Sequence, residues 1–398
     1  MVRTKLDVKM EALAKGQINL QIRPIDTWFF RESRPHDAAG ASELSSLFPP
    51  PIRTLAGALR SFIGERLEID WRTLRCENSD FDFKSVLGDA NTLGQMELNG
   101  AWICYQGKRL YPAPVYLMLK DKNVQRLLPG KPVRCDLGEK VRLPELPREF
   151  EGYKALGNAW LTAKGMAKCL NNSIPDEQDI IGPDKLFSYE TRLGIAVDNK
   201  TRNVIDKQLY QTRHLRLSPD VHIELDIKTL PDEVIACLPT DNAVIRFGGE
   251  GRMASIQAQT QAEPMPCACA DAIDTIALHF ITPAGFSGSM FPKGFEQTEL
   301  NDKTVWQGVI NDIELSIEAA VIGKVQREGG WDMEKHEPRA VQSYIPGGSV
   351  WFCRLNKHYD KQALRSQLHG RCLGDDSAYG RGHILLGHWQ DTHIQPGK

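Results

Sequence analysis

Residues 18–25 read INLQIRPI, so that apolar isoleucine and leucine side chains alternate with polar ones. This period of two predicts a half-buried β-strand. After a loop that ends in three prolines, residues 54–67 read TLAGALRSFIGERL, whose apolar side chains recur at helical spacing. That pattern predicts an amphipathic helix with Thr54 as its N-cap. The two segments therefore form a strand and a helix at the start of the fold.

The polar side of the predicted helix combines two arginines with two glycines: Arg53, Gly57, Arg60 and Gly64. Each glycine lowers helix stability by about 1 kcal/mol relative to alanine. Two glycines beside two arginines therefore indicate that something packs closely against this side of the helix.

The order of predicted elements repeats along the chain. A strand, a helix or loop, two strands, a helix and a final strand occur twice, on either side of a break at residues 263–266. This order favours an α+β protein of two ferredoxin-like (RRM-like, βαββαβ) domains over a single α/β sheet. We place the first domain at residues 1–262, with a large insertion at about 72–188, and the second at 268–398. The other strands behind this order are predicted at 193–197, 209–217, 222–227, 243–247, 275–281, 349–355 and 383–386, and a helix at 361–368.

The composition is that of an ordinary globular protein. The 398 residues include 41% hydrophobic and 25% charged side chains, which argues against wholesale disorder. No apolar run approaches the ~20 residues that cross a bilayer, and the charged N-terminal segment has no signal-peptide core. The nine cysteines are an odd number without the spacing of a disulfide framework, as expected for reduced thiols. We therefore expect a soluble, cytoplasmic protein with no membrane partner.

The formal net charge is −2, from 49 Lys and Arg against 51 Asp and Glu. A free-standing, non-specific nucleic-acid binder would normally be basic, but a local basic groove is not excluded. Such a concentration occurs between residues 192 and 216, where only Asp198 and Asp206 oppose six basic side chains: Arg192, Lys200, Arg202, Lys207, Arg213 and Arg216. On charge alone, a solvated basic hairpin accounts for this run equally well.

Three glycine-rich loops adjoin predicted strands, at residues 248–252, 285–294 and 380–382. Glycine lets successive backbone N–H groups converge on an anion, and Arg252 and Arg381 could hold a phosphate in a fork of donors. A single loop of this kind is more often only a turn. Three of them, together with the arginine side of the predicted helix, indicate a polyanionic ligand.

Other chemical signatures are weak or missing. Residues 249–254 match the dinucleotide fingerprint, but the stretch that follows has almost no apolar face with which a Rossmann helix could pack. No G-x-S-x-G and no G-x-x-x-x-G-K-[ST] motif occurs. Cys267 and Cys269 lack a second ligand pair at zinc spacing, so we expect unliganded thiols. The sequence predicts no cofactor and no metal.

Two groups of aromatic and basic side chains could bind single-stranded RNA. One is Trp-Phe-Phe-Arg at residues 28–31, and the other comprises Tyr210, Arg213 and His214. Aromatic rings stack on splayed bases while arginines bind phosphates, although the first group is more often core. His36 is the sharpest catalytic candidate, as a general base on a 2′-OH. The alternative is an exposed loop histidine without chemistry, because no partner acid or second histidine stands out in its segment.

Several stretches, in this order, resemble one known family. The chain is similar to the third subunit of the Cmr complex, the type III-B CRISPR effector, within the RAMP superfamily. The stretches span most of the chain apart from residues 118–189. They are RPIDTWFFRESRPHD at 23–37, FPPPIRTLAGALRS at 48–61, LYPAPVYL at 110–117, ETRLGIAVDNKTRNVIDKQLY at 190–210, IRFGGEGR at 245–252, TPAGF at 282–286, GGWD at 329–332, IPGGSVW at 345–351 and YGRG at 379–382.

The resemblance implies two ferredoxin-like domains related to RNA-recognition folds, and a non-catalytic role. It implies that the chain holds the 5′ handle of the CRISPR RNA and contacts the large palm-domain subunit and the first backbone subunit, for antiviral RNA-guided interference. His36 stands where an aromatic residue would be expected after Arg34-Pro35. Together with the residues singled out above, the implied contacts give this RNA-binding set: Phe30, Arg31, Arg34, Arg53, Thr54, Arg60, Arg192, Tyr210, Arg213, Gly248, Gly249, Gly251, Arg252, Gly380, Arg381 and Gly382.

Two other functions stay open at this point. One is a metal-independent endoribonuclease that processes CRISPR RNA, as some RAMP relatives do, with His36 acting beside an arginine clamp. The other is a protein-only scaffold whose glycine loops are simply turns.

Overall fold

The computed structural model describes residues 18–32, 43–76, 81–146, 148–197, 201, 203–228, 230–259, 263–268, 274–333 and 335–391. The chain divides into two compact units, each assembled from three separate stretches. Unit 1 comprises residues 1–107, 183–263 and 327–342, and unit 2 comprises residues 108–182, 264–326 and 343–398. Most of the segment 72–188, which we predicted as an insertion, lies in unit 2. The domain boundaries drawn from the sequence stay predictions.

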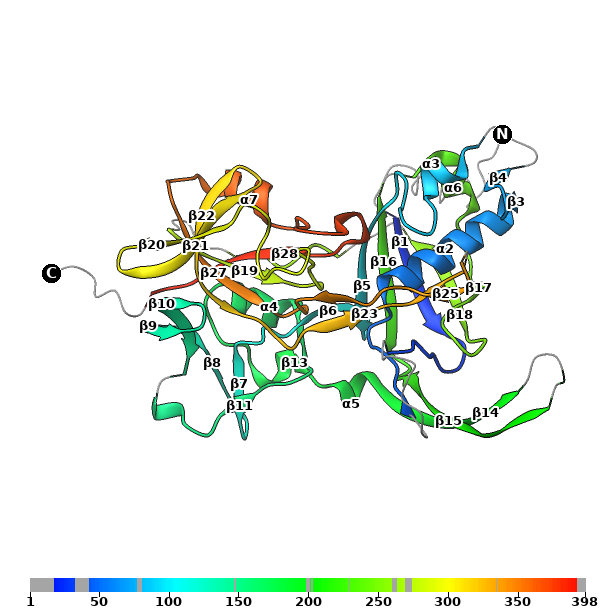
Figure 1. Cartoon of the computed structure of the whole chain (residues 1–398), viewed down its shortest axis with the longest axis horizontal. Coiled ribbons are helices and arrows are strands. Elements are labelled where there is room, and N and C mark those ends of the chain that lie inside the picture. Colours follow the sequence, from blue (N-terminus) through cyan, green and yellow to red (C-terminus); the bar gives the residue numbers. More distant parts are fainter. Residues whose placement is uncertain are drawn as a thin grey trace. The chain divides into compact units, whose positions relative to one another are not determined.

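Unit 1 contains an antiparallel sheet and two helices: β1 Ile18–Pro24, β5 Glu97–Tyr105, β16 Val221–Lys228, β17 Ala243–Arg246, β18 Met253–Gln259, α2 Ile52–Arg66 and α6 Asp232–Cys237. The strands run in the order β5–β16–β1–β18–β17 (Figure 1). Helix α2 contacts β5 and β17 and buries Leu55, Leu59 and Ile63. The strand and helix predicted from residues 18–25 and 54–67 are both confirmed.

The first turn of α2 differs from the prediction. Pro51, not Thr54, is the N-cap, and no side chain caps this helix end. The backbone N–H of Thr54 donates to the Pro51 carbonyl at 2.9 Å, so Thr54 already lies inside the first turn. The reason is that the preceding prolines hold extended backbone as far as Pro51, whose φ of −59° and ψ of 133° lead directly into the helix.

The two glycines of α2 have different surroundings. A Cβ at Gly64 would lie 2.4 Å from Cη2 of Trp71, so the close packing predicted for this side of the helix is confirmed there. A Cβ at Gly57 would meet nothing within 4 Å. Gly57 therefore has no neighbour among the described residues that explains its lack of a side chain.

We expect Gly57→Ala to raise the free energy of unfolding by about 0.5–1 kcal/mol, because alanine favours the helix and fills open space. Gly64→Ala should bring no such gain, since its methyl group displaces the Trp71 ring from the helix and from its edge-on contact with Phe83. Urea unfolding of the two variants beside the unmodified chain measures the difference. Equal stabilisation by both substitutions would contradict this assignment.

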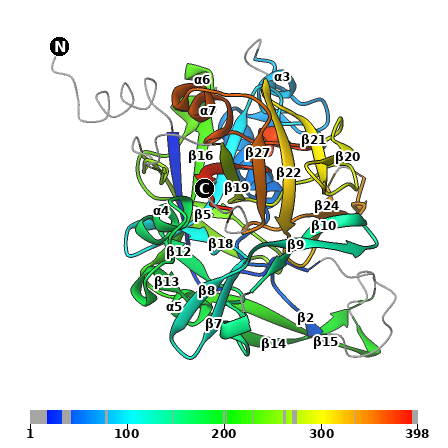
Figure 2. The same ribbon diagram turned by 90° about the vertical axis from the view of Figure 1, so that its left-hand side faces the viewer.

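Unit 2 contains a second sheet, on which α4 Ala163–Leu170 and α7 Lys361–Leu368 pack. Its strands are β9 Leu128–Cys135, β10 Gly138–Glu145, β19 Thr275–Phe280, β20 Glu296–Leu300, β21 Lys303–Ile310, β22 Ile313–Val321, β27 Val350–Leu355 and β28 Ile384–His388. The strands run in the order β28–β19–β27–β22–β21–β10–β9, and β20 pairs with β21. Figure 2 shows β27, β22 and β21 side by side. Trp351 on β27 is fully buried in the core, among Leu278, Ile317 and Leu386. The helix predicted at 361–368 is α7, with the same bounds.

The two units share one strand order. Numbered in chain order, β1, β5, β16 and β18 lie in the sequence 2-3-1-4, and so do β19, β22, β27 and β28. In unit 1, α2 follows the first of these strands and α6 precedes the last; in unit 2, α7 precedes the last, and a loop with the β20–β21 hairpin follows the first. The protein is thus a strand-dominated α+β molecule.

The remaining elements, apart from one hairpin considered below, are short. No helix among the described residues is long and apolar enough to cross a membrane. Seven of the described cysteines are free thiols, including Cys267, whereas Cys269 lies outside the described residues. The remaining bounds are β3 Ile69–Asp70, β4 Arg75–Cys76, α3 Phe83–Leu87, β6 Lys108–Pro112, β7 Leu117–Lys120, β8 Asn123–Arg126, η1 Arg148–Phe150, β11 Lys154–Ala155, β12 Trp160–Thr162, η2 Glu177–Asp179, β13 Ile180–Ile181, α5 Pro183–Leu186, β23 Gln326–Glu328, β24 Trp331–Asp332, β25 Glu337–Pro338, β26 Gln342–Tyr344 and η3 Ser377–Tyr379.

A buried ion cluster ties β10 to the rest of unit 2. The Arg142 side chain is 1% exposed and lies between two carboxylates that are each 4% exposed, Glu318 on β22 and Asp391. Its Nη1 donates to Glu318 Oε2 at 2.7 Å, and its Nη2 donates to Asp391 Oδ1 at 2.9 Å. Arg142 Nε also donates to the Gly130 carbonyl at 2.8 Å. Arg142 thus donates hydrogen bonds to acceptors on β9, on β22 and in the segment after β28.

Candidate nucleic-acid interface

A long β-hairpin in unit 1 carries part of the basic run seen in the sequence. Its strands are β14 Phe187–Val197 and β15 Val204–Leu217, and β15 also pairs with β2 Glu43–Leu44. Figure 1 shows both strands running out from the rest of unit 1. Residues directly opposite each other share a face of the hairpin, so one face presents Glu190, Arg192, His214 and Arg216.

Two carboxylates hold three arginines together at the base of this hairpin. Asp26, just after β1, accepts hydrogen bonds from Arg192 Nη2 at 3.0 Å, Arg216 Nη2 at 3.0 Å and Arg252 Nη1 at 3.2 Å. Glu190 accepts from Arg192 Nη2 at 2.6 Å and from Arg216 Nε at 2.8 Å. We call these five residues the arginine cluster. Their side chains are partly exposed, from 23% for Arg252 to 48% for Asp26 and Arg216.

The contacts within the arginine cluster favour the charged forms of Asp26, Glu190, Arg192 and Arg216. The hydrogen bond from Arg192 is the largest influence on the pKa of Asp26, and together with the bond from Arg216 it lowers this pKa against the opposing effect of burial. Hydrogen bonds from Arg216 and Arg192 lower the pKa of Glu190, and the same contacts raise the pKa of both arginines. Three guanidinium groups against two carboxylates leave a net positive charge. Such oriented guanidinium forks suit phosphate oxygens.

The glycine loop between β17 and β18 brings Arg252 to the arginine cluster. Gly248 has a φ of +90°, and a Cβ there would lie 2.7 Å from the Phe29 carbonyl oxygen. The N–H of Gly249 donates to the same carbonyl at 2.8 Å, and the N–H of Arg252 donates to the Gly249 carbonyl at 3.2 Å. At Gly251, a Cβ would meet nothing within 4 Å. The loop is therefore fixed at its base to the segment after β1 and open at its tip.

His214 lies beneath the arginine cluster rather than on its surface. The side chain is buried, and its ring stacks on Phe29 with centroids 5.1 Å apart. Its nitrogens lie 3.2 Å from Thr27 Oγ1 and 3.1 Å from Thr212 Oγ1. Burial, with the nearby arginine charges, lowers the pKa of His214 below its usual value. The neutral ring therefore supports the hairpin from inside and offers no open face for stacking.

Tyr210 and Arg213 occupy different faces of the hairpin. Tyr210 covers the opposite Gly194, where a Cβ would lie 2.3 Å from Cζ of the tyrosine ring. Arg213 projects from the face opposite the arginine cluster, pairs with Glu43 at 3.1 Å and stands 4.0 Å from the centroid of the Tyr189 ring. The hairpin thus presents basic and aromatic groups on both faces.

The loop after β1 holds further members of the predicted set. The Phe30 ring is 3% exposed and packs in the core 5.0 Å from the ring of Phe247, so no base can stack on it in this position. Arg31 is exposed, and its backbone bridges to Ser46. Arg34 and His36 lie outside the described residues, and their roles stay predictions.

Helix α2 carries the next three members of the set. Arg53 and Thr54 are half-buried in its first turn. Arg60 Nη1 donates to the carbonyls of Asp89 and Thr92, the latter at 3.1 Å. Arg60 therefore fastens the turn around Asp89 to α2, and an RNA phosphate would compete with those carbonyls for it.

The loop at Gly380–Gly382 belongs to unit 2, whereas the arginine cluster belongs to unit 1. Gly382 has a φ of +66°, and a Cβ there would lie 1.9 Å from the Leu373 carbonyl oxygen. Arg381 is 3% exposed, with its guanidinium 4.1 Å from the centroid of the Tyr344 ring. This loop is packed inside its unit, and its glycines permit a close backbone approach.

Three members of the arginine cluster were missing from the set predicted from the sequence: Asp26, Glu190 and Arg216. Part of the signal was available, since Glu190 and Arg192 are two residues apart and a strand places them on one face. Their approach to Arg216 depends on the hairpin register, in which Arg216 faces Ser188. A strand pattern does not determine that register by itself.

One family of known proteins has a sequence model that matches most of the chain. Residues 20–389 match the sequence model of a family described as CRISPR-associated protein (Cas_Cmr3). A curated relative, the CRISPR system CMR subunit Cmr3 of Saccharolobus solfataricus (strain ATCC 35092 / DSM 1617 / JCM 11322 / P2), is 28% identical over 75 residues. That alignment spans 18% of this chain and 22% of the length of the relative.

Chains in solved structures of CRISPR complexes also match this chain, at low sequence identity. One chain, from the cryo-EM structure of the type III-B Cmr-beta bound to cognate target RNA, is 16% identical with a TM-score of 0.46, over 84% of this chain and 86% of that one. Another, from the Csm3–Csm4 subcomplex in the type III-A CRISPR-Cas interference complex, is 10% identical with a TM-score of 0.38, over 86% and 94%.

Proposed function

This chain belongs to the Cmr3 family of CRISPR-associated proteins, and from that premise we propose that it is a non-catalytic, RNA-binding subunit of a type III-B CRISPR effector complex. In this proposal it holds the 5′ handle of the CRISPR RNA. It also docks the large palm-domain subunit and the first backbone subunit, for antiviral RNA-guided interference. The observation that carries the RNA-binding part is the arginine cluster beside the open glycine loop.

The strand order of the two units supports the ferredoxin-like fold that we expect for an RNA-binding subunit of this kind. We propose that both units are ferredoxin-like. Each has four strands in the order 2-3-1-4, with a helix before the last strand. In unit 2, the loop after β19 and the β20–β21 hairpin stand in the chain where a first helix would be.

The arginine cluster suits a chain of phosphates better than one small anion. Its guanidinium groups come from β14, β15 and the glycine loop, and Asp26 and Glu190 already hold them in place. Ordered side chains lose little conformational freedom when a ligand binds. Phosphates approaching from solvent would replace some of the carboxylate contacts. Tyr210, farther along the same face of the hairpin, would meet a neighbouring nucleotide, whereas Arg213 lies on the opposite face.

Asp26→Asn provides the sharpest test of how the arginine cluster works. Removing one of its two negative charges should strengthen binding of the handle RNA roughly three- to tenfold at low salt and steepen the salt dependence. Asp26 is 48% exposed, so the neutral amide should leave the fold intact. Fluorescence anisotropy with labelled handle RNA over a series of salt concentrations measures both effects.

Asp121→Asn is the matched control, because Asp121 is an exposed turn residue of unit 2 with the same charge and shape. It should leave RNA affinity unchanged. Unchanged or weaker binding by Asp26→Asn would contradict the expectation that phosphates compete with this carboxylate for the three arginines.

Two rival functions give different results in simple assays. An endoribonuclease that used His36 would cleave repeat RNA specifically without metal, and His36→Ala would abolish the cleavage. A protein-only scaffold would give no crosslink between RNA and Tyr210 within the assembled complex. We expect retention of uncut RNA and a crosslink on the hairpin.

A further inference from the structure

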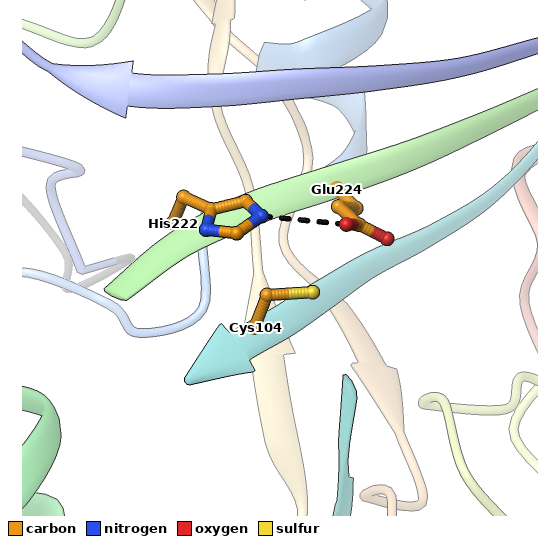
Figure 3. Close-up of side chains that lie close together, drawn as sticks. All are labelled: Cys104, His222 and Glu224. Carbon is orange, nitrogen blue, oxygen red and sulfur yellow. Dashed lines mark hydrogen bonds and ion pairs between the residues drawn. The ribbon is translucent and has the colours of Figure 1, made fainter. Parts of the chain in front are cut away.

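Three side chains of unit 1 with metal-binding chemistry converge on one face of its sheet. Cys104 lies on β5 and faces His222 on β16, and Glu224 follows two residues along β16 on the same face. Figure 3 shows the imidazole directed towards the Glu224 carboxylate, with the thiol beside them. No sequence motif predicts this group, because Cys104 and His222 are far apart in the sequence and are brought together by the register of β5 and β16.

The distances between these groups are close to those around a tetrahedral metal ion. His222 Nε2 lies 3.3 Å from Glu224 Oε1, and the three ligand atoms all lie within 4.8 Å of one another. Zn²⁺ with ~2.0–2.2 Å bonds to nitrogen and oxygen and ~2.3 Å to sulfur separates its ligands by roughly 3.3–3.6 Å. The nitrogen and oxygen already have this spacing, and a small rotation of the thiol would bring in the third ligand.

Burial of the group calls for a charge-balancing partner. Cys104 is 1% exposed and His222 is 3% exposed, and His222 Nδ1 has no hydrogen-bond partner among the described residues. A thiolate and a carboxylate together neutralise one divalent cation, so a bound ion would remove the electrostatic penalty of burying both. The unpartnered Nδ1 lies on the other edge of the imidazole from Nε2, so Nε2 is the nitrogen that would bind the ion.

The neighbouring amide already orients the carboxylate. Asn19 Nδ2 donates to Glu224 Oε2 at 3.3 Å and to Asp226 Oδ1 at 3.0 Å. Asp226 is fixed in turn by the Trp102 indole N–H at 2.9 Å. Such outer contacts around metal-binding carboxylates hold the ligand oxygen in place.

We propose that Cys104, His222 and Glu224 bind one Zn²⁺ ion that joins β5 to β16, with water in the fourth position. A thiolate, an imidazole and a carboxylate form a donor set that suits Zn²⁺, whereas Mg²⁺ and Ca²⁺ prefer oxygen ligands alone. The ion acts as a cross-strand link within the sheet of unit 1 and takes no part in RNA chemistry. The proposal is independent of the RNA-binding function.

Cobalt substitution tests the site directly. The full-length chain, purified without a histidine tag and stripped with a chelator, is titrated with Co²⁺. We expect one Co²⁺ per chain and a near-ultraviolet absorption band from thiolate-to-cobalt charge transfer, which Zn²⁺ but not Mg²⁺ abolishes. Cys104→Ser should remove the band and weaken Co²⁺ binding more than the ~10–100-fold that loss of an outer contact causes.

Cys353→Ser is the matched control, because Cys353 is an equally buried thiol in the core of unit 2. It should keep the band. Asn19→Ala, which removes only the outer contact, should keep the band and bind Co²⁺ roughly tenfold more weakly. A folded wild-type chain without the band, or a band that survives in Cys104→Ser, overturns the proposal. If Cys104→Ser does not fold, unchanged Co²⁺ affinity in both Glu224→Gln and Asn19→Ala overturns it.

Discussion

Replacing Arg252 with glutamate should weaken binding of the handle RNA about 100-fold at low salt. The substitution removes one guanidinium from the arginine cluster and places a third carboxylate beside Asp26 and Glu190. Because fewer phosphates are then neutralised, the slope of log affinity against log salt should flatten by roughly 0.7 for each lost phosphate contact. Arg53→Glu should act in the same direction if the start of α2 also contacts the handle.

Filter binding of the handle RNA by the reconstituted complex, repeated at several salt concentrations, measures both quantities. Arg72→Glu is the control, because it makes the same change of charge at an exposed turn of unit 1 outside the arginine cluster. Circular dichroism of each variant separates lost binding from lost folding. If a folded Arg252→Glu variant retained the RNA as well as the unmodified chain does, the proposal that the arginine cluster contacts the RNA would be wrong.

Arg142→Met should lower the free energy of unfolding by about 3–5 kcal/mol, since it removes the most deeply buried cation from between two buried carboxylates. Glu318 and Asp391 are each 4% exposed and could not recover water without opening unit 2. Lys303 and Arg354 also reach both carboxylates, at distances of up to 3.5 Å, but they approach from more exposed positions. They do not replace the bond of Arg142 to the Gly130 carbonyl.

Arg134→Met is the control for this prediction, because the Arg134–Glu139 pair is largely exposed, at 80% and 65%. Exposed pairs contribute about 0–1 kcal/mol. Urea unfolding of both variants gives the comparison. Similar losses in the two would mean that the buried cluster contributes no more than a surface pair.

The same cluster predicts a dependence of stability on pH. Burial by itself would raise the pKa of Glu318, but the hydrogen bond and charge of Arg354, with Lys303 and Arg142, outweigh it and lower the pKa. A carboxyl with a lower pKa in the folded state stabilises the fold at pH values above its unfolded pKa of about 4.3. That contribution is lost as the pH falls through the folded pKa, so acid should destabilise the unmodified chain more than Arg142→Met.

Elements with a clear periodicity could be read from the sequence. The alternation at 18–25 gave β1, and the apolar stripes at 54–67 and 361–368 gave α2 and α7. Strand β18 was missed, because its buried positions Ala254 and Ala258 are too small to mark an apolar face around Ile256. It is the register with β1, not hydrophobicity, that makes this segment a strand.

The sequence predicted only some of the residues of the candidate site. Arg192, Arg252 and the glycine loop do lie together in unit 1, whereas Phe30 and Arg60 are engaged inside the protein. A single sequence shows that a guanidinium is present but not which carbonyl or carboxylate holds it. The acidic members of the arginine cluster were overlooked because a search for an anion site looks only for cations.

Each unit is made from three stretches that alternate along the chain with those of the other. During translation, unit 1 lacks its final stretch until residue 342 has left the ribosome, when two of the three stretches of unit 2 have already been made. Domains that follow one another along a chain can fold one after the other during synthesis. Neither unit of this protein can complete its folding in that way, because its stretches alternate with those of the other unit. Nascent-chain intermediates should therefore expose incomplete sheet edges over most of synthesis, which makes an early supply of chaperones, or of binding partners, unusually valuable for this protein.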